Sequence, residues 1–255
     1  MESAPKLHNA TLWATIRSAV QWFFGGLALA GGAISVVIAS FFISQHALDT
    51  VFRPFVALII WSTGVRLRVH GAEKLDFKKP YIFTINHINF LDHFFLYHVI
   101  GGHLRGVQKD AHFRWPFYGI LARRMGLVPI PPRGDTQRAM QSLAKVREVF
   151  VKGFHLVMMP EGTRSKDGEL QPFKKGSFFL AVQCGATIVP TVLVGAYAFN
   201  RKGDWRFYPG PIDMYFEDSI STAGMTEADV TPLRDRVRAI IAKRIADAQN
   251  QAVLD

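Results

Sequence analysis

The stretch YIFTINHINFLD, residues 81–92, decides how this chain of 255 residues folds. It begins with an apolar run of strand length, Tyr81 to Ile85, and continues as a polar turn. The stretch FHLVMMPEGTRS, residues 154–165, has the same pattern, because its apolar run from Phe154 to Met159 also passes into a polar turn. Continuous apolar runs of this length are typical of strands buried on both faces, as in parallel sheets.

Strand and helix patterns alternate along the chain around these two stretches. Strand patterns also run from Leu104 to Gln108 and from Ile188 to Val194, and the alternating segment Arg66 to His70 is typical of an outer strand. Helical patterns lie between the strands, at Asp92 to Ile100, Pro116 to Met125, Asp135 to Val151 and Gly176 to Gln183. The alternation predicts an α/β fold with a mainly parallel sheet flanked by helices. Functional loops in such sheets follow the carboxyl ends of strands, where His87 and Glu161 both fall.

The N-terminal segment is apolar enough to enter a membrane. No Asp, Glu, Lys or Arg occurs from Ser18 to Leu48, and a second apolar stretch runs from Phe55 to Trp61. The first run is too long for a cleaved signal peptide, so we expect either one span or two helices that dip into one leaflet. We therefore predict membrane-anchoring helices in residues 1–64 and a catalytic domain in residues 65–255. Basic residues flank the run on both sides, which favours the cytoplasmic face for both ends and for the active site.

Charge and cysteine content restrict the partners and the compartment. The formal charge of +10 favours anionic partners, which are nucleic acid, phosphorylated small molecules or acidic lipid headgroups. No nucleic-acid-binding module is recognisable, so we expect membrane lipids and no nucleic acid. The single cysteine, Cys184, excludes an internal disulfide and lies in an apolar stretch typical of a core.

Two polar motifs carry the chemistry. The first places His87 and Asp92 with four residues between them, so that the carboxylate can orient the imidazole as a general base. The alternatives are a structural role for His87 and a helix-capping role for Asp92. The second places Glu161 and Arg164 on a glycine turn, where they either grip a phosphate and its neighbouring hydroxyls or form a structural salt bridge. Steps of five residues turn His93, His98 and His103 in different directions on a helix, so we expect no metal site.

These two motifs, with their spacing of about seventy residues, resemble the glycerolipid acyltransferase family of the 1-acylglycerol-3-phosphate acyltransferases. The resemblance extends from about Val69 to Gly195. It implies an O-acyltransferase that moves a fatty acyl group from a thioester, on coenzyme A or acyl carrier protein, to the 2-hydroxyl of 1-acylglycerol 3-phosphate. No cofactor is implied beyond the thioester co-substrate. The chain contains no nucleophile elbow, so we expect direct transfer without an acyl-enzyme.

The resemblance also implies the site residues. His87 would be the base and Asp92 its orienting partner, and the acceptor would be held by Glu161, Gly162, Thr163 and Arg164. Two further cations, Lys109 and Arg133, match positions where the family has groups that contact phosphate. Apart from the resemblance, Lys174 and Lys175 stand at the expected start of a helix, where they either favour a phosphate or the coenzyme, with Lys175 as the predicted site residue, or form a solvated surface pair. Two alternatives remain open at this point, which are a different acceptor, such as glycerol 3-phosphate or a lyso-aminolipid, and a non-catalytic membrane protein that binds anionic lipid.

Overall fold

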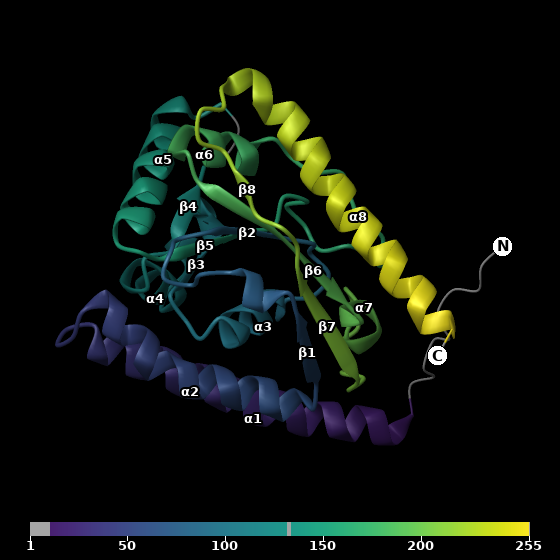
Figure 1. The fold of residues 1–255 in the computed structure, drawn as a ribbon. Helices are drawn as coiled ribbons and strands as arrows, with labels where there is room; N and C mark the ends of the chain where they lie inside the picture. The colour runs from purple at the N-terminus through teal and green to yellow at the C-terminus, as the bar shows by residue number, and fades with distance from the viewer. Residues whose placement is uncertain (1–10, 132–133, 255) are drawn as a thin grey trace.

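The structure is a computed structural model that describes residues 11–131 and 134–254, and it is built on one sheet (Figure 1). The strands are β1 (Arg66–His70), β2 (Ile82–Ile85), β3 (Leu104–Lys109), β4 (Val128–Ile130), β5 (His155–Met158), β6 (Thr187–Val194), β7 (Pro211–Phe216) and β8 (Ile220–Ser221). The helices are α1 (Leu12–Ala39), α2 (Gln45–Thr63), α3 (Asp92–Val99), α4 (Tyr118–Arg124), α5 (Thr136–Val151), α6 (Gly176–Cys184), α7 (Ala196–Phe199) and α8 (Val230–Leu254). Short 3-10 turns are η1 (Ala72–Lys74), η2 (Asp110–Arg114) and η3 (Glu227–Asp229).

The strand order in the sheet is β1-β7-β6-β2-β5-β3-β4, with β8 paired to β6. Strands β6, β2, β5, β3 and β4 are parallel to one another, and β1 is parallel to β7. Only the pairings of β6 with β7 and with β8 are antiparallel among the described strands. The expected mainly parallel α/β sheet is therefore confirmed, with β1 at its edge, whereas β4, β7, β8 and α7 were not anticipated from the sequence.

Helices cover both faces of this sheet, and each face has its own apolar cluster. In the buried strand β5, Val157 faces the cluster formed with α1, α2 and α3, while Leu156 and Met158 face the cluster formed with α5, α6 and α8. Successive side chains of a strand point to opposite faces, so a strand covered by helices on both sides must be apolar throughout. Figure 1 shows this layering, with α1 and α2 on one side of the sheet and α5, α6 and α8 on the other.

Helices α1 and α2 form an antiparallel hairpin along one flank of the sheet (Figure 1). Their first turns are capped by Thr11 and Ser44, whose side chains accept from backbone N–H groups, and Gly64 ends α2 in the left-handed conformation. Among the described helices, α1 alone has the length and composition to cross a bilayer. Much of its apolar surface is exposed, including Trp13, Val20, Leu27, Ile34, Ile38 and Phe42 of the following turn.

A buried ion pair fastens α2 to the sheet. The carboxylate of Asp49 in α2 accepts two hydrogen bonds from the Arg105 guanidinium in β3, at 3.0 and 2.9 Å, and a third from the hydroxyl of Tyr97 at 2.8 Å. Arg105 also lies over the Phe154 ring, 3.8 Å from its centroid. Both charged side chains are buried, and their attraction and hydrogen bonds offset the free-energy cost of removing the two charges from water. The hairpin is thus part of the same packed body as the sheet.

Candidate functional site

The two polar motifs meet at one edge of the sheet. His87 follows β2 and Glu161 follows β5, and these strands are parallel neighbours in which Thr84 pairs with Met158. The carboxyl ends of adjacent parallel strands lie at the same edge, which brings together residues 74 positions apart in the chain. The expectation that both motifs share this edge is met.

The imidazole of His87 is paired with the Asp92 carboxylate. Nδ1 of His87 lies 3.0 Å from Oδ2 of Asp92, and the same oxygen accepts from the backbone N–H groups of Ile88 and Asn89 at 2.8 and 2.9 Å. Within the described residues Nε2 of His87 has no hydrogen-bond partner, and the side chain is 20% exposed. The ring is therefore fixed through one nitrogen and open at the other, the arrangement that a general base requires.

Asp92 is the first residue of α3, yet its carboxylate bonds back to the turn instead of capping the helix. Residue Leu91 occupies the cap position without a side-chain hydrogen bond. Burial raises the pKa of the Asp92 carboxyl, while the His87 ring and the N–H groups of Asn89 and Ile88 oppose the rise. The carboxylate is therefore a buried organiser of the turn and of the ring, and the alternative of a simple helix cap is not what the structure shows.

The second motif holds the backbone of His87 from both sides. Glu161 accepts the His87 N–H through Oε1 at 2.5 Å and the Gln171 N–H through Oε2 at 2.9 Å. The Ser165 N–H donates to the His87 carbonyl at 2.8 Å. Both peptide groups of His87 are thus bound by the turn that follows β5, so the two motifs form one unit.

Glu161 is buried, and its two oxygens accept from main-chain N–H groups instead of pairing with Arg164. Burial raises the pKa of its carboxyl, and the two backbone N–H groups oppose this by stabilising the ionised form. With both oxygens occupied by main-chain donors, Glu161 acts in this structure as a brace between the motifs. The expectation that it also holds the acceptor stays a prediction.

A cluster of cations surrounds the glycine turn. Gly162 has a φ of +71°, and a side chain there would meet the ammonium group of Lys174. The ammonium group of Lys202 donates to the Thr163 hydroxyl at 3.0 Å and to the Arg164 carbonyl at 3.1 Å. The Arg164 guanidinium itself has no hydrogen bond or ion pair among the described residues, so it is free to receive an anion.

The other expected cations are distributed differently. Lys109 ends β3 at the same edge of the sheet, is exposed, and is unpaired within the described part of the chain. Arg133 lies outside the described residues. Lys175 is the N-cap residue of α6 and lines a pocket with Phe179 and with Val230 of α8, whereas its neighbour Lys174 lies against Gly162. Consecutive side chains point in different directions, so the structure brings Lys174 rather than Lys175 to the turn.

Of the two lysines beside the glycine turn, Lys202 was not indicated by any sequence signal, and Lys174 was indicated only together with Lys175. Lys202 lies in the loop after α7, 38 positions beyond Arg164, and no local motif marks it. Lys174 was visible as one half of a Lys-Lys pair at a helix start, but the sequence offered no means of choosing between the two.

Comparisons with known proteins agree with this geometry. A family model described as acyltransferase matches residues 66–194. The 1-acyl-sn-glycerol-3-phosphate acyltransferase of Limnanthes douglasii is 34% identical over 201 residues, which cover 78% of this chain and 70% of that protein. The corresponding alpha protein of Homo sapiens is 30% identical over 190 residues, which cover 74% and 66%.

A solved structure shares the fold. The crystal structure of the 1-acyl-sn-glycerophosphate (LPA) acyltransferase PlsC from Thermotoga maritima superposes with a TM-score of 0.75 and covers 93% of this chain and 97% of its own. At 20% identity this likeness establishes the shared architecture and not the chemistry.

Proposed function

Because this chain belongs to the acyltransferase family and is an O-acyltransferase, we propose that it transfers a fatty acyl group from a thioester to the 2-hydroxyl of 1-acylglycerol 3-phosphate, giving phosphatidic acid. The observation that carries the proposal is the His87–Asp92 pair at 3.0 Å, held beside a glycine turn that presents an unpaired Arg164. The names of the relatives support this choice of acceptor.

The proposed reaction uses His87 as the base. Nε2 takes the proton of the acceptor hydroxyl while that oxygen attacks the thioester carbonyl carbon, and the carbon–sulfur bond then breaks. The proton passes from His87 to the departing thiolate, so the ring ends the cycle neutral. Asp92 holds the tautomer that leaves Nε2 unprotonated and stabilises the charged ring in between.

The cations around residues 162–164 are the proposed phosphate site. Arg164 supplies a planar fork of donors, and Lys174 and Lys202 add positive charge on either side of the same turn. Lys109, at the end of β3 on the same edge, is a candidate for the phosphates of a coenzyme A donor. Acyl carrier protein is the other thioester class that would serve, and we expect neither a metal nor a further cofactor.

We further propose that the α1–α2 hairpin lies in one leaflet and does not span the bilayer. α1 has 28 residues and is about 42 Å long at 1.5 Å per residue. Near its start, the Ser18 hydroxyl accepts from the Phe207 N–H at 2.9 Å, and just beyond its end Gln45 donates to the Arg124 carbonyl of α4 at 3.1 Å. A helix pair held to the domain at both ends lies along the membrane surface, with its exposed apolar face in contact with lipid. The flanking basic residues favour the cytoplasmic side for the active site.

Two variants test the proposed reaction. His87→Ala should lower turnover by about 10²- to 10⁴-fold with little change in the Michaelis constant for the acceptor, because general acid–base groups contribute that much to rate. Arg164→Ala should raise that constant about tenfold or more for 1-acylglycerol 3-phosphate and hardly at all for monoacylglycerol, which lacks the phosphate.

The assay is chromatographic separation of labelled products from purified protein, a labelled acyl thioester and a panel of lysolipids. A folded His87→Ala protein that kept more than about a tenth of wild-type turnover would refute the assignment of the base. If Arg164→Ala raised the Michaelis constants for both acceptors equally, Arg164 would not belong to the phosphate site. If glycerol 3-phosphate or a lyso-aminolipid were acylated in preference, that compound would be the acceptor instead of 1-acylglycerol 3-phosphate.

A further inference from the structure

The indole of Trp22, on helix α1, lies against the turn that carries the base. Its ring is stacked on Phe90, with centroids 5.3 Å apart and planes 10° from parallel. It is also stacked on Phe207, at 5.1 Å. Phe90 belongs to the turn between His87 and Asp92, so a residue of the N-terminal hairpin touches the segment that holds the catalytic pair.

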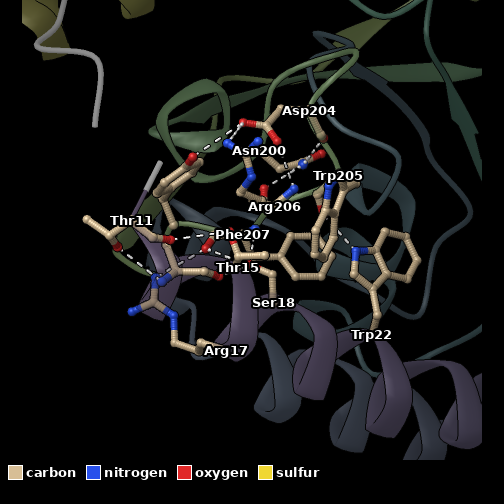
Figure 2. Close-up of polar contacts among 12 residues, drawn as sticks. Thr11, Thr15, Arg17, Ser18, Trp22, Asn200, Asp204, Trp205, Arg206 and Phe207 are labelled. Atoms are coloured by element: carbon tan, nitrogen blue, oxygen red, sulfur yellow. Dashed lines mark hydrogen bonds and ion pairs between the residues drawn. The ribbon is translucent and has the colours of Figure 1, made fainter. Parts of the chain in front are cut away.

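The indole is fixed by polar contacts with the loop after α7. Figure 2 shows Trp22 and Ser18 of α1 facing residues 204–207. The indole Nε1 donates to the Trp205 carbonyl at 2.7 Å, and the buried Ser18 hydroxyl accepts from the Phe207 N–H at 2.9 Å. These bonds fix both the position of α1 and the angle of the indole.

The same loop is bonded to the turn that holds the base. The side chain of Asn200 donates to the carbonyls of Asp204 and Arg206 at 2.8 and 2.9 Å, which shapes the loop (Figure 2). The carbonyl of Asn200 in turn accepts from the side chain of Asn89 at 3.3 Å. A closed ring of contacts therefore runs from α1 through the loop to Asn89, and returns through Phe90 to Trp22.

We propose that Trp22 is a positioning residue for catalysis, because its indole holds Phe90 and thereby sets the turn from His87 to Asp92. The inference rests on the proposed role of His87. Glu161 and Ser165 bind the backbone of His87, while Asn89 and Phe90 are the turn residues that contact the α1 side. Without the indole, Phe90 keeps only the more distant Phe207 ring, at 6.1 Å, as an aromatic partner among the described residues. The turn then loses its closer packing contact, which is one of the restraints on the 3.0 Å distance between the His87 ring and the Asp92 carboxylate.

The test compares Trp22→Ala with Phe23→Ala in the intact chain, assayed in detergent micelles. Phe23 is the next aromatic residue on α1, is 67% exposed, and has a ring contact only with Phe24 among the described residues. Trp22→Ala should lower kcat about tenfold or more and change the acceptor KM less than about threefold, since a misplacement of about 1 Å costs up to 10²-fold in rate. Trp22→Phe should recover most of kcat because it restores a stacking ring, and Phe23→Ala should match the wild type.

Two further readouts separate positioning from a loss of folded protein. The pH profile of kcat should shift in Trp22→Ala but not in Phe23→Ala, because the environment of the base changes only in the first. The double variant Trp22→Ala/Phe90→Ala should be no slower than the slower single variant, because both act through one contact. If Trp22→Ala does not fold, Phe90→Ala alone tests the same contact from the turn.

Four results would overturn the inference, and the first three are a kcat of Trp22→Ala equal to that of Phe23→Ala, a loss confined to KM, and full additivity with Phe90→Ala. An unchanged pH profile together with a reduced folded fraction would assign Trp22 to stability alone and would equally overturn it. The proposed function fails separately, through an active His87→Ala. An inactive His87→Ala beside a fully active Trp22→Ala removes only the role of Trp22.

Discussion

Replacement of Glu161 by glutamine tests the brace between the two motifs. Glu161 accepts one N–H from His87 and one from Gln171. Glutamine has a single acceptor oxygen, so one of these N–H groups would face the amide NH2 and lose its partner. A hydrogen bond to a charged group is worth about 1.5 to 3 kcal/mol, and burial of the carboxylate costs part of that, so we expect a net loss of about 2 kcal/mol.

For a chain of this size that loss corresponds to a fall of about 4 to 8 °C in the melting temperature. Because the His87 peptide would move, kcat should also fall by about 10- to 100-fold while the acceptor KM changes little. Glu169→Gln is the matched control, since Glu169 is exposed and its carboxylate has no partner within the described residues. Thermal unfolding and steady-state kinetics in the same detergent measure both quantities.

The reasoning would be refuted if Glu161→Gln raised the acceptor KM and left kcat and the melting temperature unchanged. That outcome would make Glu161 a direct ligand of the acceptor, as the family resemblance implied, and the main-chain bonds would then be dispensable. Parallel losses in Glu161→Gln and Glu169→Gln would point instead to a general effect of surface charge.

Three further outcomes are expected. Asp49→Asn should destabilise the fold by about 3 to 5 kcal/mol because it leaves the buried Arg105 charge unpaired, and denaturant unfolding that showed less than about 1 kcal/mol would contradict this. Burial lowers the pKa of His155 to about 4 from its usual 6.5, so the folded state binds this proton less tightly and the contribution of His155, full above pH 6.5, is lost as the pH falls toward 4. His155→Asn, which keeps an acceptor for the Tyr81 N–H, should therefore lose less stability between pH 7 and 4.5 than the wild type. If the melting temperatures of variant and wild type fell equally between these two pH values, His155 would not be responsible for the loss. The intact chain should stay with membranes through high-salt and alkaline washes and need detergent for release, because salt does not screen apolar burial, and release by salt alone would show that α1 is not embedded.

Local sequence determined several of the elements and the pairing of His87 with Asp92. Apolar runs and helical periods predicted β2, β5 and α3 to within one or two residues. A strand buried on both faces needs a continuous apolar run, and a helix buried on one side needs apolar residues every three or four positions, so both are visible in the sequence. The spacing of His87 and Asp92 is local as well, so one turn and the start of one helix suffice to bring ring and carboxylate together. The unexpected strand β7 does carry a period of two, because Ile212, Met214 and Phe216 are buried and the residues between them are not, so this signal was present and was missed. Strand β8 has only two residues, which is too short for any period to appear.

Only the tertiary structure decided which distant groups meet at the site. The order β2-β5-β3 places Glu161 on the backbone of His87, and nothing in either segment encodes which strand becomes its neighbour. Lys202 reaches the glycine turn through a loop 38 positions away, and Trp22 reaches Phe90 only because α1 packs across that loop. The sequence pattern indicates which residues will be buried. Which residues they pack against is decided by how the helices and the sheet pack together.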